Sequence, residues 1–223
     1  MTYSVISYIP YMLEGLYWTL ALVAGSLALG FLIGLPVALG EVYGGRIVET
    51  VLRIYVWFFR GVPLLVLLFL FHWGVLPLLG LNPSPLFTSV LVLGMRSGAY
   101  QSQIFRGAIS AIKWGEIQAA RALGMTRLQE IVYIVIPQAL RIALPGWSNE
   151  YAIILKDSAV CFTLGVVEVL TRAKYIAIST GVHLLPYLFA GLMFLVLTYM
   201  GTGFINKIYA RISVPGLVGA EKT

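Results

Sequence analysis

A run of 26 residues without one charged side chain, from Gly15 to Gly40, leaves this chain very few ways to fold. A helix needs about 20 consecutive apolar residues to cross the hydrocarbon core of a bilayer. The composition of the whole chain supports the same interpretation, because 60% of its residues are hydrophobic and only 11% are charged. A soluble domain has about 25% charged residues. We therefore predict an all-α integral membrane protein whose first spanning helix lies in this run.

Further apolar runs predict four more spanning helices. The 35 uncharged residues between Arg60 and Arg96 are interrupted by the turn signal NPSP at 82–85, so one helix ends and another begins there. Pro63 is expected to break the earlier of these two helices, and Pro137 to separate the fourth span from the helix before it, because proline lacks a backbone donor. We expect one transmembrane domain over residues 1–223. Its predicted spans are about 12–40, 50–79, 86–108, 140–170 and 184–207.

The distribution of basic residues predicts the orientation of these helices. Ten Lys and Arg residues fall in one set of loops, and only Arg172 and Lys174 fall in the other. Because cytoplasmic loops carry the excess of basic residues, the N-terminus is predicted outside and the C-terminus inside. The net charge of +6 is then explained by loops that face the anionic cytoplasmic leaflet, and nucleic-acid binding is not expected.

A short polar segment, about residues 110–137, is predicted to lie in the cytoplasm between the third and fourth spans. Its first helix, over 114–123, would be only about 14 Å long and too short to be stable without packing on something. Gly124 is expected to end this helix in the left-handed conformation, and Thr126 with Gln129 to open the next helix as a capping box. An amphipathic loop on the lipid surface and a docking helix for a soluble partner both fit this pattern.

The same segment resembles a known family. The stretches GEIQAARALG (115–124) and IPQALR (136–141) resemble the Glu-Ala-Ala loop of ATP-binding cassette importer permeases, in particular the subunits for polar amino acids. Three further stretches resemble motifs of that family in the same order along the chain. They are FFRGVPLLVLLF (58–69), GAYQSQIFRGAISAIKWG (98–115) and NEYAIILKDSAV (149–160).

The sequence also departs from the family pattern. The glutamate of the loop motif aligns with Gln118, and the neighbouring glutamine of the motif aligns with Glu116. The carboxylate has therefore moved by two residues, about 200° around the helix. Gln103 stands where the family has a glutamate, and Ser158 with Ala159 stands where it has a Thr-Ser pair. A salt bridge to an ATPase cannot form from Gln118, although a hydrogen bond can.

The resemblance implies a permease subunit that forms the path for a polar amino acid in a multi-pass cell inner or plasma membrane. It implies two ATPase subunits, a second permease subunit that is the same or a related chain, and an extracellular or periplasmic solute-binding protein. The chain itself is then no enzyme and binds no cofactor, and ATP and Mg belong to the partner ATPase. In agreement, the sequence has no Gly-x-x-x-x-Gly-Lys-Ser/Thr phosphate loop. The coupling residues implied are Glu116, Gln118, Ala119, Ala120, Arg121 and Gly124.

Charged and polar residues inside the predicted spans are candidates for the substrate path, because each charge there costs about 2.5–3.5 kcal/mol on insertion scales. Six of the seven form pairs spaced by seven residues, and each pair shares one helical face. The candidates are Arg60, Arg96, Gln103, Asn149, Glu150, Lys156 and Asp157.

Structural roles for the same residues stay open. Lys156 and Asp157 could pair with neighbouring helices, Glu150 could lie near the cytoplasmic interface, and Arg60 could tie the Gly-Pro break to a neighbour. If Arg96 lines the path, its positive charge favours a neutral or acidic substrate over a cationic amino acid. The sequence leaves the transported molecule and the identity of the partner permease open.

Two other functional classes fit the sequence less well. A secondary transporter driven by an ion gradient would use Asp157 or Glu150 as its coupling carboxylate, but such folds have inverted repeats and more spans. A membrane-embedded enzyme would need a nucleophile–base pair, for which the sequence offers no candidate. His72 and His183 stand alone, so a metal site is not expected. A tightly bound ATPase would separate the permease from both alternatives.

Overall fold

The uncharged run near the start of the chain forms the 35-residue helix α2 (Ile9–Tyr43) in the computed structural model, which describes residues 8–213. Long and short helices follow, and no strand is found between residues 8 and 213. The remaining elements are α3 (Arg46–Gly61), α4 (Leu64–Phe69), the π-helix η1 (Leu70–Val75), α5 (Leu76–Leu78), α6 (Pro85–Ser110), α7 (Trp114–Ala122), α8 (Arg127–Gln129), the π-helix η2 (Glu130–Val135), α9 (Ile136–Ser158), the 3-10 helix η3 (Ala159–Leu164), α10 (Val169–Thr180) and α11 (Leu184–Ile212).

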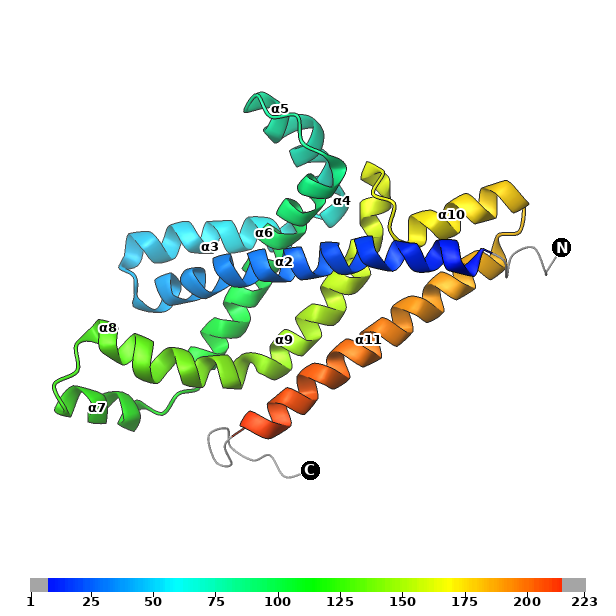
Figure 1. Cartoon of the computed structure of the whole chain (residues 1–223). Helices are drawn as coiled ribbons and strands as arrows, with labels where there is room; N and C mark the ends of the chain where they lie inside the picture. Colours follow the sequence, from blue (N-terminus) through cyan, green and yellow to red (C-terminus); the bar gives the residue numbers. More distant parts are fainter. Residues whose placement is uncertain (1–7, 214–223) are drawn as a thin grey trace.

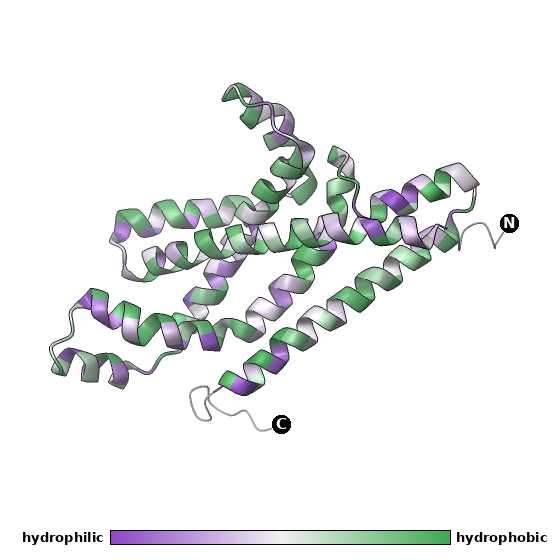
Figure 2. Ribbon diagram, viewed as in Figure 1, coloured by the Kyte–Doolittle hydropathy of each residue, from purple (hydrophilic) through white to green (hydrophobic). Residues whose placement is uncertain are grey.

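These helices form an elongated bundle (Figure 1). α2 and α11 run most of its length, α9 lies between them, and α6 crosses α2. The start of α2 and the helix α10 lie at one end, and α7 with α8 lies at the opposite end. Hydrophobic residues cover most of the long helices, whereas hydrophilic residues gather at α7 and α8 and along parts of α6 and α9 (Figure 2).

The expected break at Pro63 is confirmed. α3 ends at Gly61, Val62 is extended, and α4 starts directly after Pro63 at an angle of 107° to α3. The residue before a proline avoids the helical conformation for steric reasons, so the Val-Pro pair produces the bend.

The helix boundary expected at Pro137 is wrong, because residues 127–164 form one continuous helical stretch. The π-helix η2 ends at Val135, two residues before Pro137, and its wider turn leaves room for the proline ring, which would clash with a regular α-helical turn. The helix predicted to start near Leu140 therefore begins at Arg127. It also ends earlier than the predicted residue 170, at Leu164, because Gly165 is left-handed with φ +91°.

After this stop the chain forms a separate short helix, α10. Its N-cap is Glu168, whose carboxylate accepts hydrogen bonds from the backbone N–H groups of Leu170 and Thr171, both at 2.7 Å. Arg172 then donates to the Glu14 carboxylate at 2.6 Å, so α10 is tied to the start of α2.

The small residues of α2 form a packing face. A Cβ atom on Gly34 would lie 2.9 Å from Gln101 Cβ and 3.0 Å from the carbonyl oxygen of Gly98. Ser26 is fully buried. α2 and α6 can therefore approach more closely than helices with larger side chains would allow.

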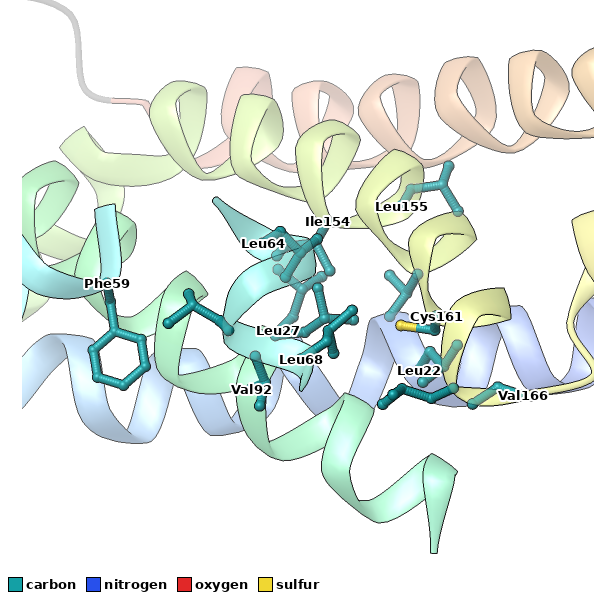
Figure 3. Packing of buried hydrophobic residues seen from close by; sticks show 14 of the residues in the cluster. Leu22, Leu27, Phe59, Leu64, Leu68, Val92, Ile154, Leu155, Cys161 and Val166 are labelled. Carbon is teal, nitrogen blue, oxygen red and sulfur yellow. The ribbon is translucent and has the colours of Figure 1, made fainter. Parts of the chain in front are cut away.

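Three clusters of buried apolar residues hold the bundle together. The central one joins α2, α4, α6, α9 and η3 through residues such as Leu27, Leu68, Val92, Ile154 and Cys161 (Figure 3). The cluster includes Ala99 on α6 and Ile154 on α9, close in sequence to the buried polar residues Ser97 and Glu150. Apolar packing therefore fixes the relative position of these polar groups.

By length and composition, three helical stretches could cross a membrane: Pro10–Tyr43, Arg127–Leu164 and Leu184–Ile212. The bent pair of α3 with α4–α5 is a fourth candidate if its halves count as one span. α6 is not among these candidates. Its polar residues Ser97, Gln101 and Ser102 are fully buried, because α2, α3 and α9 cover the helix.

Candidate functional site

A buried hydrogen-bond network links α2, α6 and α9 in the interior of the bundle. Ser97 donates to the carboxylate of Glu150 at 2.7 Å. The Gln101 amide donates to the Ser97 hydroxyl at 3.0 Å and to the Leu27 carbonyl at 3.2 Å, and it accepts from the indole N–H of Trp147 at 2.8 Å. Glu150 is only 2% exposed, so neighbouring side chains cover it almost completely. The carboxylate is held inside the bundle by α6.

A second polar group lies beside this network. Arg96 on α6 forms an ion pair with Asp157 on α9. The guanidinium of Arg96 also lies over the ring of Tyr100, 5.1 Å from its centroid, and Arg60 lies over the same ring at 4.9 Å. Pairing of Asp157 with a neighbouring helix, one of the open alternatives, is therefore what the structure shows. Tyr100 brings Arg60 and Arg96 together.

A cavity of about 470 Å³ opens beside Tyr100 between α2, α3 and α6. Arg60 and Gln103 both line it, together with Arg53, Arg106 and Glu41. The Gln103 amide donates to the Glu41 carboxylate at 2.8 Å. Three guanidinium groups and one carboxylate thus surround a space large enough for a small polar molecule.

The candidates from the sequence are only partly brought together. Arg60, Arg96 and Gln103 lie around Tyr100 and the cavity, and Asp157 joins them through Arg96. Glu150 belongs to the buried network instead. Asn149 and Lys156 are exposed on α9.

The sequence analysis missed several residues of this interior: Ser97, Tyr100, Gln101 and Trp147. Spacing offered one usable signal, because Tyr100 is four residues after Arg96, and residues at this spacing lie side by side on a helix. The partners of Ser97 and Gln101 lie on other helices, and no local pattern identifies them.

The short helix α7 lies at one end of the bundle, and its predicted boundaries are confirmed. Gly124 has φ +79°, and Thr126 and Gln129 form the capping box. Ala120 faces inward and is 4% exposed, whereas Gln118 and Ala119 are exposed.

Two side-chain contacts fasten α7 to the helix that follows it. Gln138 donates to the Glu116 carboxylate at 2.6 Å. Arg121 donates to the Glu130 carboxylate through Nε at 2.8 Å and through Nη2 at 3.4 Å. These bonds, and the nearby negative charge, raise the pKa of the Arg121 guanidinium above its ordinary value. Glu130 and Gln138 were not recognised from the sequence.

Long apolar helices, a buried polar interior and a short polar helix at one end define a permease, a membrane protein that forms a path for a solute. The chain belongs to the family of binding-protein-dependent transport system inner membrane components, whose family model matches residues 26–214. This finding confirms the resemblance and the membrane localisation expected from the sequence.

Named relatives agree with this assignment. The nopaline transport system permease protein NocM of Agrobacterium fabrum is 37% identical over 205 residues, covering 88% of this chain and 85% of that protein. The arginine transport system permease protein ArtQ of Bacillus subtilis is 33% identical over 208 residues, covering 93% and 94%. The histidine/lysine/arginine/ornithine transport system permease protein HisM of Salmonella typhimurium is 32% identical over 199 residues, covering 85% of each.

Solved structures match in fold. The crystal structure of an amino acid ABC transporter with histidines has a TM-score of 0.84 at 32% identity and covers 94% of this chain and 97% of that chain. The inward-facing MetNI methionine ABC transporter has a TM-score of 0.82 at 20% identity, covering 93% and 99%, and supports the fold alone.

This chain is therefore the permease subunit of an ABC importer and not an enzyme. The ion-driven secondary transporter is not favoured by any of these relatives. Permease subunits of this family have no cofactor of their own, and family membership implies an ATPase and a substrate-binding protein as partners.

Proposed function

We propose that this chain, with a second permease subunit that is the same or a related chain, carries a polar amino acid across the membrane, and that α7 docks on a separate ATPase that binds ATP and Mg. The observation that carries the proposal is the position of α7. Its exposed Gln118 and Ala119 lie at one end of the bundle, and one continuous helix, 127–164, runs from there to the interior residues Glu150 and Asp157.

We further propose five spans with the N-terminus outside, formed by α2, the bent α3–α5, α6, the continuous 127–164 helix and α11. The 26 residues of α6 correspond to about 39 Å, enough to cross a hydrocarbon core of about 30 Å. In this proposal the polar residues of α6 are tolerated because neighbouring helices cover them.

The coupling role extends to Glu116, Gln118, Ala119, Ala120, Arg121 and Gly124. It is tested with the ATPase subunit that copurifies with this chain. Gln118→Cys, paired with single cysteines in the ATPase, is expected to form a cross-link that ATP binding alters. A cysteine at exposed Ser179 on α10 is the control and should give no such product. If cross-links form only with lipid reagents, α7 lies on the membrane surface and the proposal fails.

We propose Arg60, Arg96, Gln103, Asn149, Glu150, Lys156 and Asp157 as the residues of the substrate path. The charge preference expected from the sequence rests on Arg96, which is paired with Asp157. ArtQ and HisM are named for cationic amino acids. We therefore propose a cationic amino acid as substrate, in place of the neutral or acidic one expected from the sequence.

Substrate-stimulated ATPase activity with arginine, lysine, glutamine and glutamate tests this choice. Arginine or lysine is expected to stimulate the reconstituted transporter most strongly. Stimulation by glutamate alone would contradict the proposal and restore the expectation from the sequence. The solute-binding protein must be present in each assay, since it delivers the substrate in the proposed mechanism.

A further inference from the structure

Both carboxylates of the 110–137 segment accept hydrogen bonds from other side chains of the same chain. Glu116, near the start of α7, accepts a hydrogen bond from Gln138 on α9. Glu130, the first residue of η2, accepts two from Arg121 near the end of α7. We call these two contacts the α7 clasp. They hold both ends of a nine-residue helix against the single continuous helix that follows it.

The Arg121–Glu130 contact joins an exposed guanidinium to a buried carboxylate. The Glu130 side chain is 1% exposed, whereas that of Arg121 is 52% exposed. A carboxylate removed from water needs a compensating charge and hydrogen bonds, and both come from Arg121. Two bonds from one guanidinium to one carboxylate also restrict the angle between the groups, so this contact limits rotation of α7 as well as its distance.

The clasp acts at a point where the main chain is less regular. η2 is a π-helix from Glu130 to Val135, and such segments have wider turns than an α-helix. The loop between α7 and α8 contains the left-handed Gly124. Without side-chain contacts, α7 would be joined to the helix that follows it through a glycine-containing loop alone.

The clasp also determines which surface α7 presents. Glu116 is exposed, and one oxygen of its carboxylate, which is displaced from the family position, accepts the hydrogen bond from Gln138. The exposed surface of α7 then contains Gln118, Ala119 and the apolar Trp114 and Leu123, which are 59% and 83% exposed. A partner would therefore meet mainly apolar and hydrogen-bonding groups here.

We propose that Arg121 and Glu130, supported by Glu116 and Gln138, are positioning residues that lock α7 to the 127–164 helix, so that a displacement of α7 moves the helix carrying Glu150 and Asp157 as one rigid unit. The inference rests on the proposed docking of α7 on an ATPase. It adds the residues of this chain that transmit the displacement of α7 to the 127–164 helix.

The experiment uses the complete transporter, with its ATPase subunits and binding protein, in proteoliposomes, and measures substrate transported per ATP hydrolysed. Glu130→Gln keeps the size of the side chain and removes the charge. We expect transport per ATP to fall about 2- to 30-fold, the range seen when a mutation alters coupling between sites, while ATP hydrolysis continues. The matched control is Glu49→Gln, which removes an exposed ion pair to Arg53 on α3 and should leave the ratio unchanged.

A structural readout accompanies the ratio. Spin labels at the exposed Leu123 and at the exposed Tyr133 on η2 report the distance between α7 and the following helix. We expect a narrow distance distribution in the parent transporter and a broad one in Glu130→Gln. A change in stability alone would leave the transport ratio of the assembled complex as it was.

The outcomes separate the two proposals. If Gln118→Cys cross-links to the ATPase but Glu130→Gln transports normally per ATP, the clasp is not needed for coupling and the inference is overturned. If no cross-link forms, the docking proposal fails and the inference fails with it. If Glu130→Gln does not assemble, Arg121→Lys decides the matter. It keeps the positive charge but loses the two-bond geometry, and an unchanged transport ratio in that variant would overturn the inference.

Discussion

Tyr100 illustrates how single residues organise this interior. The guanidinium groups of Arg60 and Arg96 both lie over its ring, and Arg96 is in turn paired with Asp157. Cations attracted to a ring face gain more when water is excluded. Two arginines from different helices can therefore lie close together, because the aromatic ring and one carboxylate offset their repulsion.

We predict that Asp157→Asn reduces the transport rate about tenfold or more, because a hydrogen bond to a charged group is worth about 1.5–3 kcal/mol and its loss leaves Arg96 without a counter-charge. Uptake of labelled substrate into proteoliposomes measures the effect. Adding Arg96→Gln to this variant should restore normal assembly by removing the unpaired charge. Uptake by Asp157→Asn at the parent rate would show that the ion pair has no part in transport.

Close packing of the helix backbones stabilises helix pairs as much as the burial of apolar surface does. The α2–α6 contact depends on glycines in both helices: Gly34 lies against Gly98 and Gln101, and Gly94 lies against Leu29. Membrane helices gain little hydrophobic energy from association, since lipid is as apolar as their side chains. Tight packing and the buried hydrogen bonds of Gln101 therefore carry much of the stability of this pair.

Gly34→Val is expected to lower the thermal unfolding temperature of the detergent-solubilised chain, because even a Cβ at this position would lie 2.9 Å from Gln101 Cβ. Overpacking of this kind costs about 1–3 kcal/mol. Gly191→Val is the matched control on α11, where a Cβ would meet nothing within 4 Å. Equal melting temperatures for the two variants would contradict the prediction.

The turn after α7 depends on one backbone conformation. Gly124→Ala should destabilise it by about 1–2 kcal/mol, because a residue with a Cβ is strained at φ +79°. We expect faster proteolytic cleavage between α7 and α8 in this variant. Gly115→Ala serves as control, because Gly115 is helical and has open space around its Cβ position. Identical cleavage rates would show that this turn tolerates the strain.

The polar parts of the protein are distributed along the long axis of the bundle. α10 with the start of α2 lies at one end, α7 and α8 lie at the other, and the buried polar residues of α6 and α9 lie between them. The continuous 127–164 helix connects the α7 end with the interior. Such an arrangement suits a subunit that receives mechanical input at one membrane face and moves polar groups within the membrane.

Cysteine labelling of intact cells tests the proposed orientation. Cys161, the one cysteine in the sequence, is fully buried, so the background should be low. A membrane-impermeant maleimide is expected to modify Ser179→Cys on α10 from outside, and to modify Leu123→Cys only after the cells are opened. The reverse pattern would mean that the N-terminus is inside.

Local sequence rules predicted much of this protein, because its spans, caps and breaks depend on neighbouring residues. The uncharged run of α2, the bend at Pro63, the left-handed Gly124 and the capping box at Thr126 follow from hydropathy, ring sterics and backbone donors. The same rules were wrong at Pro137, where the π-helix before it absorbs the proline within a longer helix.

The pairings within the site follow from how the helices cross. Arg96 and Asp157 are 61 residues apart in sequence, and Glu116 and Gln138 are 22 apart. Hydropathy shows that such residues need a partner, but any of several helices could supply it. The close α2–α6 packing and the apolar cluster around Leu68 and Ile154 select the partner, because they fix which faces of α6 and α9 meet.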